Sequence, residues 1–176
     1  YKKQLKQFHI LSDRHILVVE TDMSFSDVQK VVALSDKIRK AGNELVGLMR
    51  KHYDQLMRTK RYRKLLRLYG STENKSIRNN LAIQLNDMQK QYNVTWDYCR
   101  RSMIPIGKKY GIDAIFALTK AEDIWRGIEK CLYDDGNAIH FSKYGDLPCI
   151  RAKQINRGIP ISVKDNKLSF KLGKSI

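Results

Sequence analysis

A long helical pattern runs through residues 24–58, SFSDVQKVVALSDKIRKAGNELVGLMRKHYDQLMR. Its apolar positions recur three, four or seven residues apart, which is the spacing of side chains on one face of a helix. These positions are Val28, Val31, Ile38, Leu45, Met49, His52 and Leu56. Ser26 and Gln29 have the spacing of a capping box at the start of such a helix. The stretch therefore predicts a long amphipathic helix, which we expect to continue to Tyr69 before Gly70 ends it.

Helical spacing extends well beyond this stretch. A second apolar stripe repeats at intervals of three or four residues, at Ile77, Leu81, Leu85, Met88 and Tyr92. A third helix begins near Trp96, and we expect an interruption at Pro105 because proline removes a backbone donor and clashes with the preceding turn. Residues 112–118 predict a short helical piece. Thr119 and Glu122 then predict a second capping box, which would open a separate last helix.

The two ends of the chain show the two-residue period of strands instead. Residues 7–23 contain two β-prone runs separated by a turn. Near the other end, Leu168, Phe170 and Leu172 alternate with polar positions, and Asp165–Asn166 precedes them as a tight hairpin turn.

Further strands are expected at residues 138–142 and 149–155. Because each β-prone end is too small to be stable alone, we expect one structure built from both ends. The predicted fold class is α+β, with a helical bundle inserted between strands of a small antiparallel β-barrel or sheet. Residues 1–23 and 137–176 would form the β domain, and residues 24–136 the inserted helical domain.

The composition points to a polyanionic partner. The chain has 34 Lys and Arg against 18 Asp and Glu, a formal net charge of +16 over 176 residues. Such an excess repels itself in the folded state and usually exists to bind a polyanion, of which nucleic acid is the first candidate. No apolar run is long enough to predict a transmembrane helix. Three widely spaced cysteines match neither a disulfide framework nor a zinc motif, which favours a reducing cytosol.

The cations gather in three clusters. The first runs from Arg50 to Arg67 with a single acid, Asp54, and on one continuous helix Arg50, Arg58 and Arg61 would share a face. The second lies on the predicted strands near the C-terminal end, and the third is the pair Arg100–Arg101. The candidate nucleic-acid contacts are Arg50, Arg58, Arg61, Arg63, Lys64, Arg67, Arg100, Arg101, Lys143, Arg151, Lys153, Arg157 and Lys171.

Each feature also has an explanation that involves no ligand. A charged helix is most often a solvated face, although such a face normally carries ion pairs four residues apart, which a stripe of one sign lacks. A basic edge strand also deters aggregation. Trp96 and Trp125 could stack on bases, but both fall at apolar helical positions, which favours core packing.

The sequence contains no constellation that supports catalysis. The four histidines lack partners at zinc-ligand spacing, and no phosphate-binding glycine motif or nucleophile elbow is present. The adjacent acids Glu122–Asp123 and Asp134–Asp135 could in principle hold a metal ion. At helix ends, such pairs are far more often capping residues.

Three stretches carry a resemblance to a known family: 121–132, AEDIWRGIEKCL; 139–147, IHFSKYGDL; and the hairpin end 168–174, LSFKLGK. With the basic strand between them, they resemble the N-terminal half of transposon-encoded TnpB proteins and of type V CRISPR effectors, which are RNA-guided nucleases. In that family a helical recognition lobe is inserted into a β-barrel wedge domain. The family's RuvC acids and zinc-binding cysteines lie downstream of this region, and nothing in this sequence matches them.

The resemblance implies that the chain binds guide RNA and target DNA in the prokaryotic cytosol or nucleoid, without a cofactor of its own and as part of a longer polypeptide. Lys143, Arg151, Lys153, Arg157 and Lys171 would lie on wedge strands, and the run from Arg50 to Arg67 on the recognition lobe. Two alternatives stay open. One is a helical interaction module whose basic face docks an acidic protein, and the other is a complete small nuclease that uses the adjacent acids.

Overall fold

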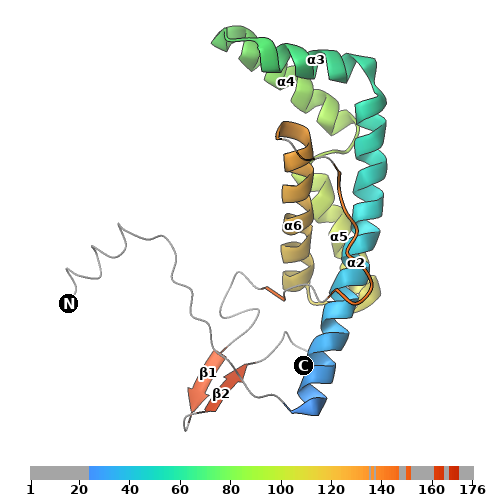
Figure 1. The fold of residues 1–176 in the computed structure, drawn as a ribbon, viewed down its shortest axis with the longest axis vertical. Coiled ribbons are helices and arrows are strands. Elements are labelled where there is room, and N and C mark those ends of the chain that lie inside the picture. Colours follow the sequence, from blue (N-terminus) through green and yellow to red (C-terminus); the bar gives the residue numbers. More distant parts are fainter. Residues whose placement is uncertain are drawn as a thin grey trace, which may run out of the picture.

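A computed structural model describes residues 24–134, 136, 138–146, 150–151, 161–164 and 167–170. Its elements are α2 (Phe25–Arg58), α3 (Lys60–Ser71), α4 (Lys75–Gln91), α5 (Trp96–Tyr110), α6 (Ala114–Tyr133), β1 (Ile161–Lys164) and β2 (Lys167–Phe170). Helices α2, α5 and α6 run side by side, and the antiparallel pair α3 and α4 lies across one end of them (Figure 1). Within the described ranges, no helix is both long enough and apolar enough to span a membrane.

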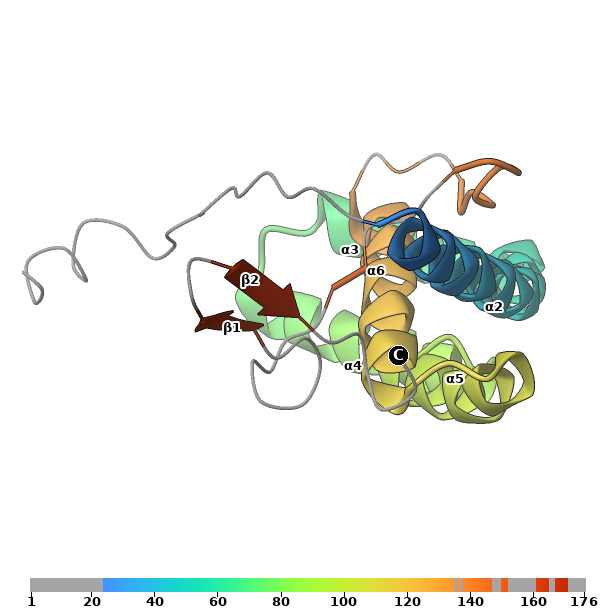
Figure 2. The ribbon, with the colours of Figure 1, turned by 90° about the horizontal axis from the view of Figure 1, so that it is seen from below.

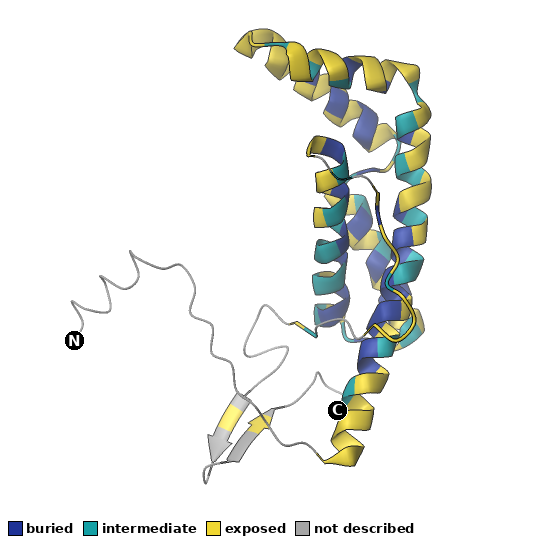
Figure 3. Cartoon of the chain, viewed as in Figure 1, coloured by how far each residue is buried: buried dark blue, intermediate teal, exposed yellow. Residues whose placement is uncertain are grey.

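The core forms where the apolar stripes of the helices meet. From α2 it takes Leu34, Ile38, Ala41, Leu45, Met49 and Leu56, all of them buried. Met103 of α5 and Ile128 of α6 are fully buried against this stripe. The helical residues therefore bury a continuous core among themselves, which is why the bundle does not need a sheet to cover it (Figure 3).

The first predicted helix is two helices. Thr59 adopts an extended conformation, with φ −73° and ψ 115°, and its backbone N–H donates to the Leu56 carbonyl. Beyond this residue α3 turns away from the axis of α2 (Figure 1). The N-terminal cap also differs from the prediction, because the side chain of Ser24, rather than Ser26, accepts from the Asp27 amide.

Two predicted interruptions are absent. Helix α5 continues through Pro105 because buried Met103 and Ile106 on either side hold it against the core. Helix α6 runs through Thr119, whose hydroxyl donates to the carbonyl of Ile115 four residues earlier, at 2.8 Å, and so caps nothing.

The predicted α+β fold class is wrong. In the described part of the chain the fold is helical, and β1 pairs only with β2, in an antiparallel hairpin that matches Ile161 with Phe170. These described residues contain no barrel and no sheet shared between the two ends. The strands expected in residues 7–23, and most of 149–155, lie outside the described residues.

Residues 138–142, a further predicted strand, form no strand. Together with a turn at residues 143–146 they make a non-helical segment, here called the strap, that runs along α2 (Figures 1 and 2). Ile139 is buried in the core, so the strap packs on the helices rather than pairing with another strand.

Candidate nucleic-acid interface

The cations of α3 occupy one side of that helix. Tyr62 and Leu65 are buried on the opposite side. Positions three and four residues apart share a face, and the exposed cations follow this spacing around the solvent side: Lys60, Arg61, Arg63, Lys64 and Arg67. In Figure 3 the outer surface of α3 is correspondingly almost all exposed.

No acid among the described residues forms an ion pair with the cations of this face. The ion pairs found among the described residues all involve other cations, on α2, α4, α5, α6 and at Arg151. From Arg58 to Arg78 the chain carries eight basic residues and one acid, Glu73. A solvated helix face normally uses ion pairs three or four residues apart, so the basic face of α3 differs from the other charged faces of this molecule.

A buried polar contact fastens α3 and α4 to the rest of the bundle. The side-chain amide of Gln89 donates to the hydroxyl of the fully buried Tyr62 at 2.9 Å, and Tyr133 of α6 donates to the other end of the same amide at 3.0 Å. Burial raises the pKa of Tyr62, so its hydroxyl stays neutral. The basic face is therefore presented on a fixed support.

Two predicted contacts lie on α2. Arg50 and Arg58 are exposed and lie eight residues apart, about 12 Å along a helix. The expectation that Arg61 shares their face assumed one continuous helix, and the break at Thr59 between α2 and α3 removes that assumption.

Among the other predicted contacts, the described ones lie on other elements than α3. Arg100 and Arg101 both pair with Asp97 on α5, at 3.3 and 2.8 Å, as a solvated face does. Arg151 pairs with Asp123 of α6. Lys143 is exposed on the strap, and Lys153, Arg157 and Lys171 lie outside the described residues.

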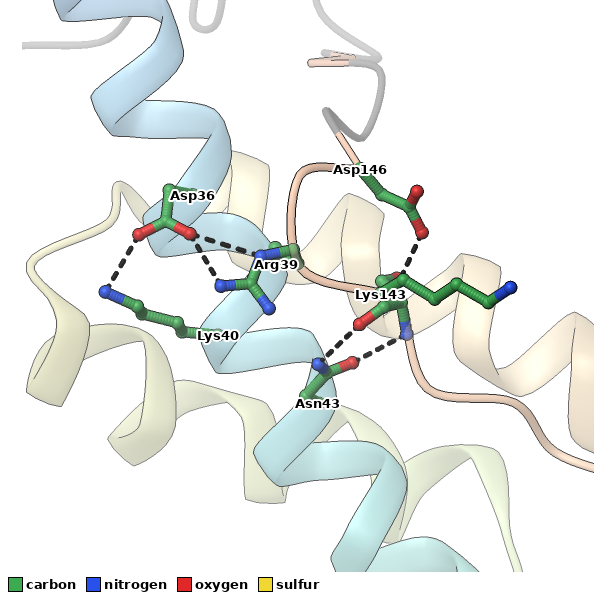
Figure 4. Close-up of polar contacts among 7 residues, drawn as sticks. Asp36, Arg39, Lys40, Asn43, Lys143 and Asp146 are labelled. Atoms are coloured by element: carbon green, nitrogen blue, oxygen red, sulfur yellow. Dashed lines mark hydrogen bonds and ion pairs between the residues drawn. The ribbon is translucent and has the colours of Figure 1, made fainter.

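Sequence reasoning missed the anchor of the strap. The side-chain amide of Asn43 donates to the Ser142 carbonyl and accepts from the Ser142 N–H, both at 2.9 Å (Figure 4). This pair of bonds replaces the partner that a neighbouring strand would provide. Figure 4 also shows Asp146 closing the end of the strap by accepting from the Lys143 N–H, at 2.7 Å.

Beside this anchor, one turn of α2 holds three charged groups together. Arg39 is buried and donates to one oxygen of Asp36, at 3.1 and 2.7 Å, while Lys40 donates to the other at 2.8 Å (Figure 4). Hydrogen bonds from Lys40 and Arg39 hold the pKa of Asp36 below its ordinary value. No sequence signal separates Arg39 from the exposed cations around it, since the acid three residues before it is common on solvated helices.

A cavity of about 410 Å³ lies between α2, α6 and the strap, with Gly42, Lys120, Asp123 and Lys130 in its lining. The stem of Lys120 crosses Gly42 so closely that a Cβ there would lie 2.6 Å from Lys120 Cε. Burial lowers the pKa of the Lys120 amine.

Side chains suited to catalysis do not converge in the described residues. No group of three or more His, Cys, Asp and Glu within the described ranges lies close enough to hold a metal ion. Burial raises the pKa of Cys99 to about 12, which keeps its thiol protonated and unreactive. Of the adjacent acids, Glu122 lies 3.8 Å from Arg126 and Asp123 pairs with Arg151, so each faces a cation of its own.

The tryptophans differ in exposure. Trp125 is half-buried against the core, as its helical position predicted, whereas Trp96 at the start of α5 is 37% exposed.

Comparison of the chain with protein-family models, with curated proteins and with solved structures returned no match in any of the three.

Proposed function

We propose that this chain binds nucleic acid through the basic face of α3, continued by Arg50 and Arg58 of α2. One observation carries the proposal: five exposed cations line one side of a short helix, and no acid among the described residues pairs with any of them. Arginine and lysine in such a row can contact successive phosphates and release their counterions.

The resemblance to TnpB-like and type V effector proteins supports a more specific proposal. In that setting the helical block holds guide RNA and target DNA through backbone contacts, and base pairing between the two strands supplies sequence specificity. The protein then recognises the shape and charge of a duplex, which suits a surface of cations without a fixed base-reading element.

The test compares two variants that remove the same charge. The first replaces five cations of α3 by glutamine: Lys60, Arg61, Arg63, Lys64 and Arg67. The control replaces five exposed cations that form ion pairs elsewhere: Lys30, Lys40, Lys90, Lys109 and Arg126.

Affinity for a duplex RNA and for a duplex DNA is measured by fluorescence anisotropy. We expect the α3 variant to lose about 10²-fold or more in affinity, and the control variant to lose far less, because its cations already have partners. Equal losses would mean that net charge alone draws the polyanion, and would refute a local interface on α3.

The same assay separates nucleic acid from an acidic protein partner. If the surface binds nucleic acid, affinity should require a minimum duplex length and should differ between RNA and DNA. If the surface binds acidic proteins, heparin of comparable charge should bind equally well. Competition by heparin with no dependence on duplex length would favour the interaction module.

A further inference from the structure

Two aromatic rings stand out from the strap beside the cations of α2. Tyr144 is 92% exposed and Phe141 is 47% exposed. An exposed aromatic ring contributes little to folding, and single exposed apolar residues need no explanation. Here, however, the two rings lie three residues apart on one segment, and each has an arginine close to it.

Both arginines come from α2. The guanidinium carbon of Arg39 lies 5.5 Å from the centre of the Tyr144 ring, and that of Arg50 lies 6.0 Å from the centre of the Phe141 ring. These distances are within the range of cation–π contacts. Asp36 holds the Arg39 guanidinium in place, so this group stays beside the Tyr144 ring. Arg50 is exposed and can reach a ligand as well as the ring.

The strap is fixed to the helices before and between these two rings, and a turn within the strap orders the backbone around the second ring. Asn43 holds the backbone at Ser142 with two hydrogen bonds, and Ile139 is buried in the core on the N-terminal side. On the C-terminal side Asp146 accepts from the Lys143 backbone. The rings are therefore presented on an ordered backbone, which lowers the conformational entropy lost when a ligand stacks on them.

We propose that Phe141 and Tyr144 form a stacking platform for the bases of a single-stranded nucleic acid, whose phosphates are contacted by Arg50 and Lys143. Aromatic rings interleaved with cations are the general arrangement by which proteins hold single strands without reading their sequence. Lys143 is exposed, and the acid nearest to it along the chain, Asp146, is occupied by the strap backbone. This inference rests on the proposed function and adds a single-stranded segment to the polyanion that α3 binds.

The test uses strands that differ only in their bases. Fluorescence anisotropy compares oligo(U) RNA and oligo(dT) DNA of about 16 nucleotides with abasic strands of equal length, which keep the phosphates. The variant carries Phe141→Leu and Tyr144→Leu, which keep apolar bulk and remove the rings. The control is Phe25→Leu, which removes a 78% exposed ring from the far end of α2.

We expect the unmodified protein to bind the strands with bases at least tenfold more tightly than the abasic strands, since each stacked base contributes substantially to affinity. The double variant should lose this preference while its affinity for the abasic strand stays the same, and the control should behave like the unmodified protein. A difference between oligo(U) and oligo(dT) would identify which strand the platform serves.

Equal binding of abasic and base-containing strands by the unmodified protein would overturn the inference, as would a double variant that keeps the preference. Either result, together with intact duplex binding, would leave the proposed function standing. Failure to bind any strand or duplex would instead refute both. If the surface instead binds an acidic protein, that protein should displace strands with and without bases to the same extent. It should do so equally from the double variant and from the unmodified protein.

Discussion

At the scale of single residues, burial changes the chemistry of side chains that appear ordinary in the sequence. His52 is a half-buried histidine on α2 whose Nε2 lies 3.1 Å from the Tyr98 hydroxyl. Burial, assisted by the neighbouring Lys51, lowers the pKa of His52 below its ordinary value. Its apolar spacing predicted a place on the inner face of the helix, but its hydrogen-bond partner, on another helix, could not be predicted from spacing alone.

The lowered pKa of His52 predicts a pH-dependent stability. The native state holds the neutral ring, so the contribution of His52 is complete above its ordinary pKa, about 6.5, and is lost as the pH falls through the lower folded-state value. The free energy of unfolding, measured by urea denaturation, should therefore decrease from pH 7 toward pH 5.5 by more in the unmodified protein than in His52→Gln. Parallel pH profiles would contradict this assignment.

Gly107 and Gly127 form a matched pair for testing the packing of α5 on α6. A Cβ at Gly107 would lie 2.9 Å from the Cβ of Ala117, whereas a Cβ at Gly127 would meet nothing within 4 Å. We expect Gly107→Ala to destabilise the protein by about 1–3 kcal/mol through overpacking. Gly127→Ala should stabilise it by up to about 1 kcal/mol through helix propensity. Thermal denaturation would show opposite shifts in Tm, and shifts of the same sign would contradict the packing described.

At the scale of elements, most of the apolar stripes of α2, α4 and the second half of α6 could be predicted from the sequence, because an amphipathic helix repeats its own signal over many residues. The first predicted members of two stripes, Val28 and Ile77, are instead exposed.

The ends of the helices could not be predicted. Thr59 ends a helix although it is neither glycine nor proline. Pro105 does not end a helix, because the packing of its neighbours in the core outweighs its local conformational preference. The position of Arg61 relative to Arg50 and Arg58 could not be predicted for the same reason, because it depends on the break at Thr59.

The attachment of α3 and α4 through Gln89 gives a prediction at this scale. Gln89→Leu would leave the buried Tyr62 hydroxyl without its partner, and a buried unsatisfied polar group costs about 1–3 kcal/mol. Tyr133→Phe removes a part-buried contact whose donor belongs to a residue that is 58% exposed, and it should cost less. Chemical denaturation of both variants measures the two values. A cost for Gln89→Leu no larger than that for Tyr133→Phe would show that this contact does not hold the two helices in place.

At the scale of the whole molecule, the charge of the chain predicted a class of partner, and the structure shows where among the described residues that charge is left unpaired. The prediction of a sheet joining the two ends failed because the strap takes its hydrogen bonds from Asn43 and its burial from Ile139. The bonds between Asn43 and Ser142 join residues 99 positions apart in the sequence. The periodicity of neighbouring residues carries no information about such a contact. The ion pairs of Arg100 and Arg101 with Asp97 lie within one helix, at a spacing of three and four residues, and could have been predicted from the sequence.

The central claim is that the basic face of α3 contacts the phosphates of a nucleic acid, and its most direct test is the salt dependence of duplex binding. With about six phosphate contacts, affinity should fall by about 10³ between about 50 and 200 mM salt. The variant with the five α3 cations replaced by glutamine should give a much shallower slope, because each lost contact removes about 0.9 from the exponent. A slope near zero in the unmodified protein, or the same slope in both proteins, would contradict the account.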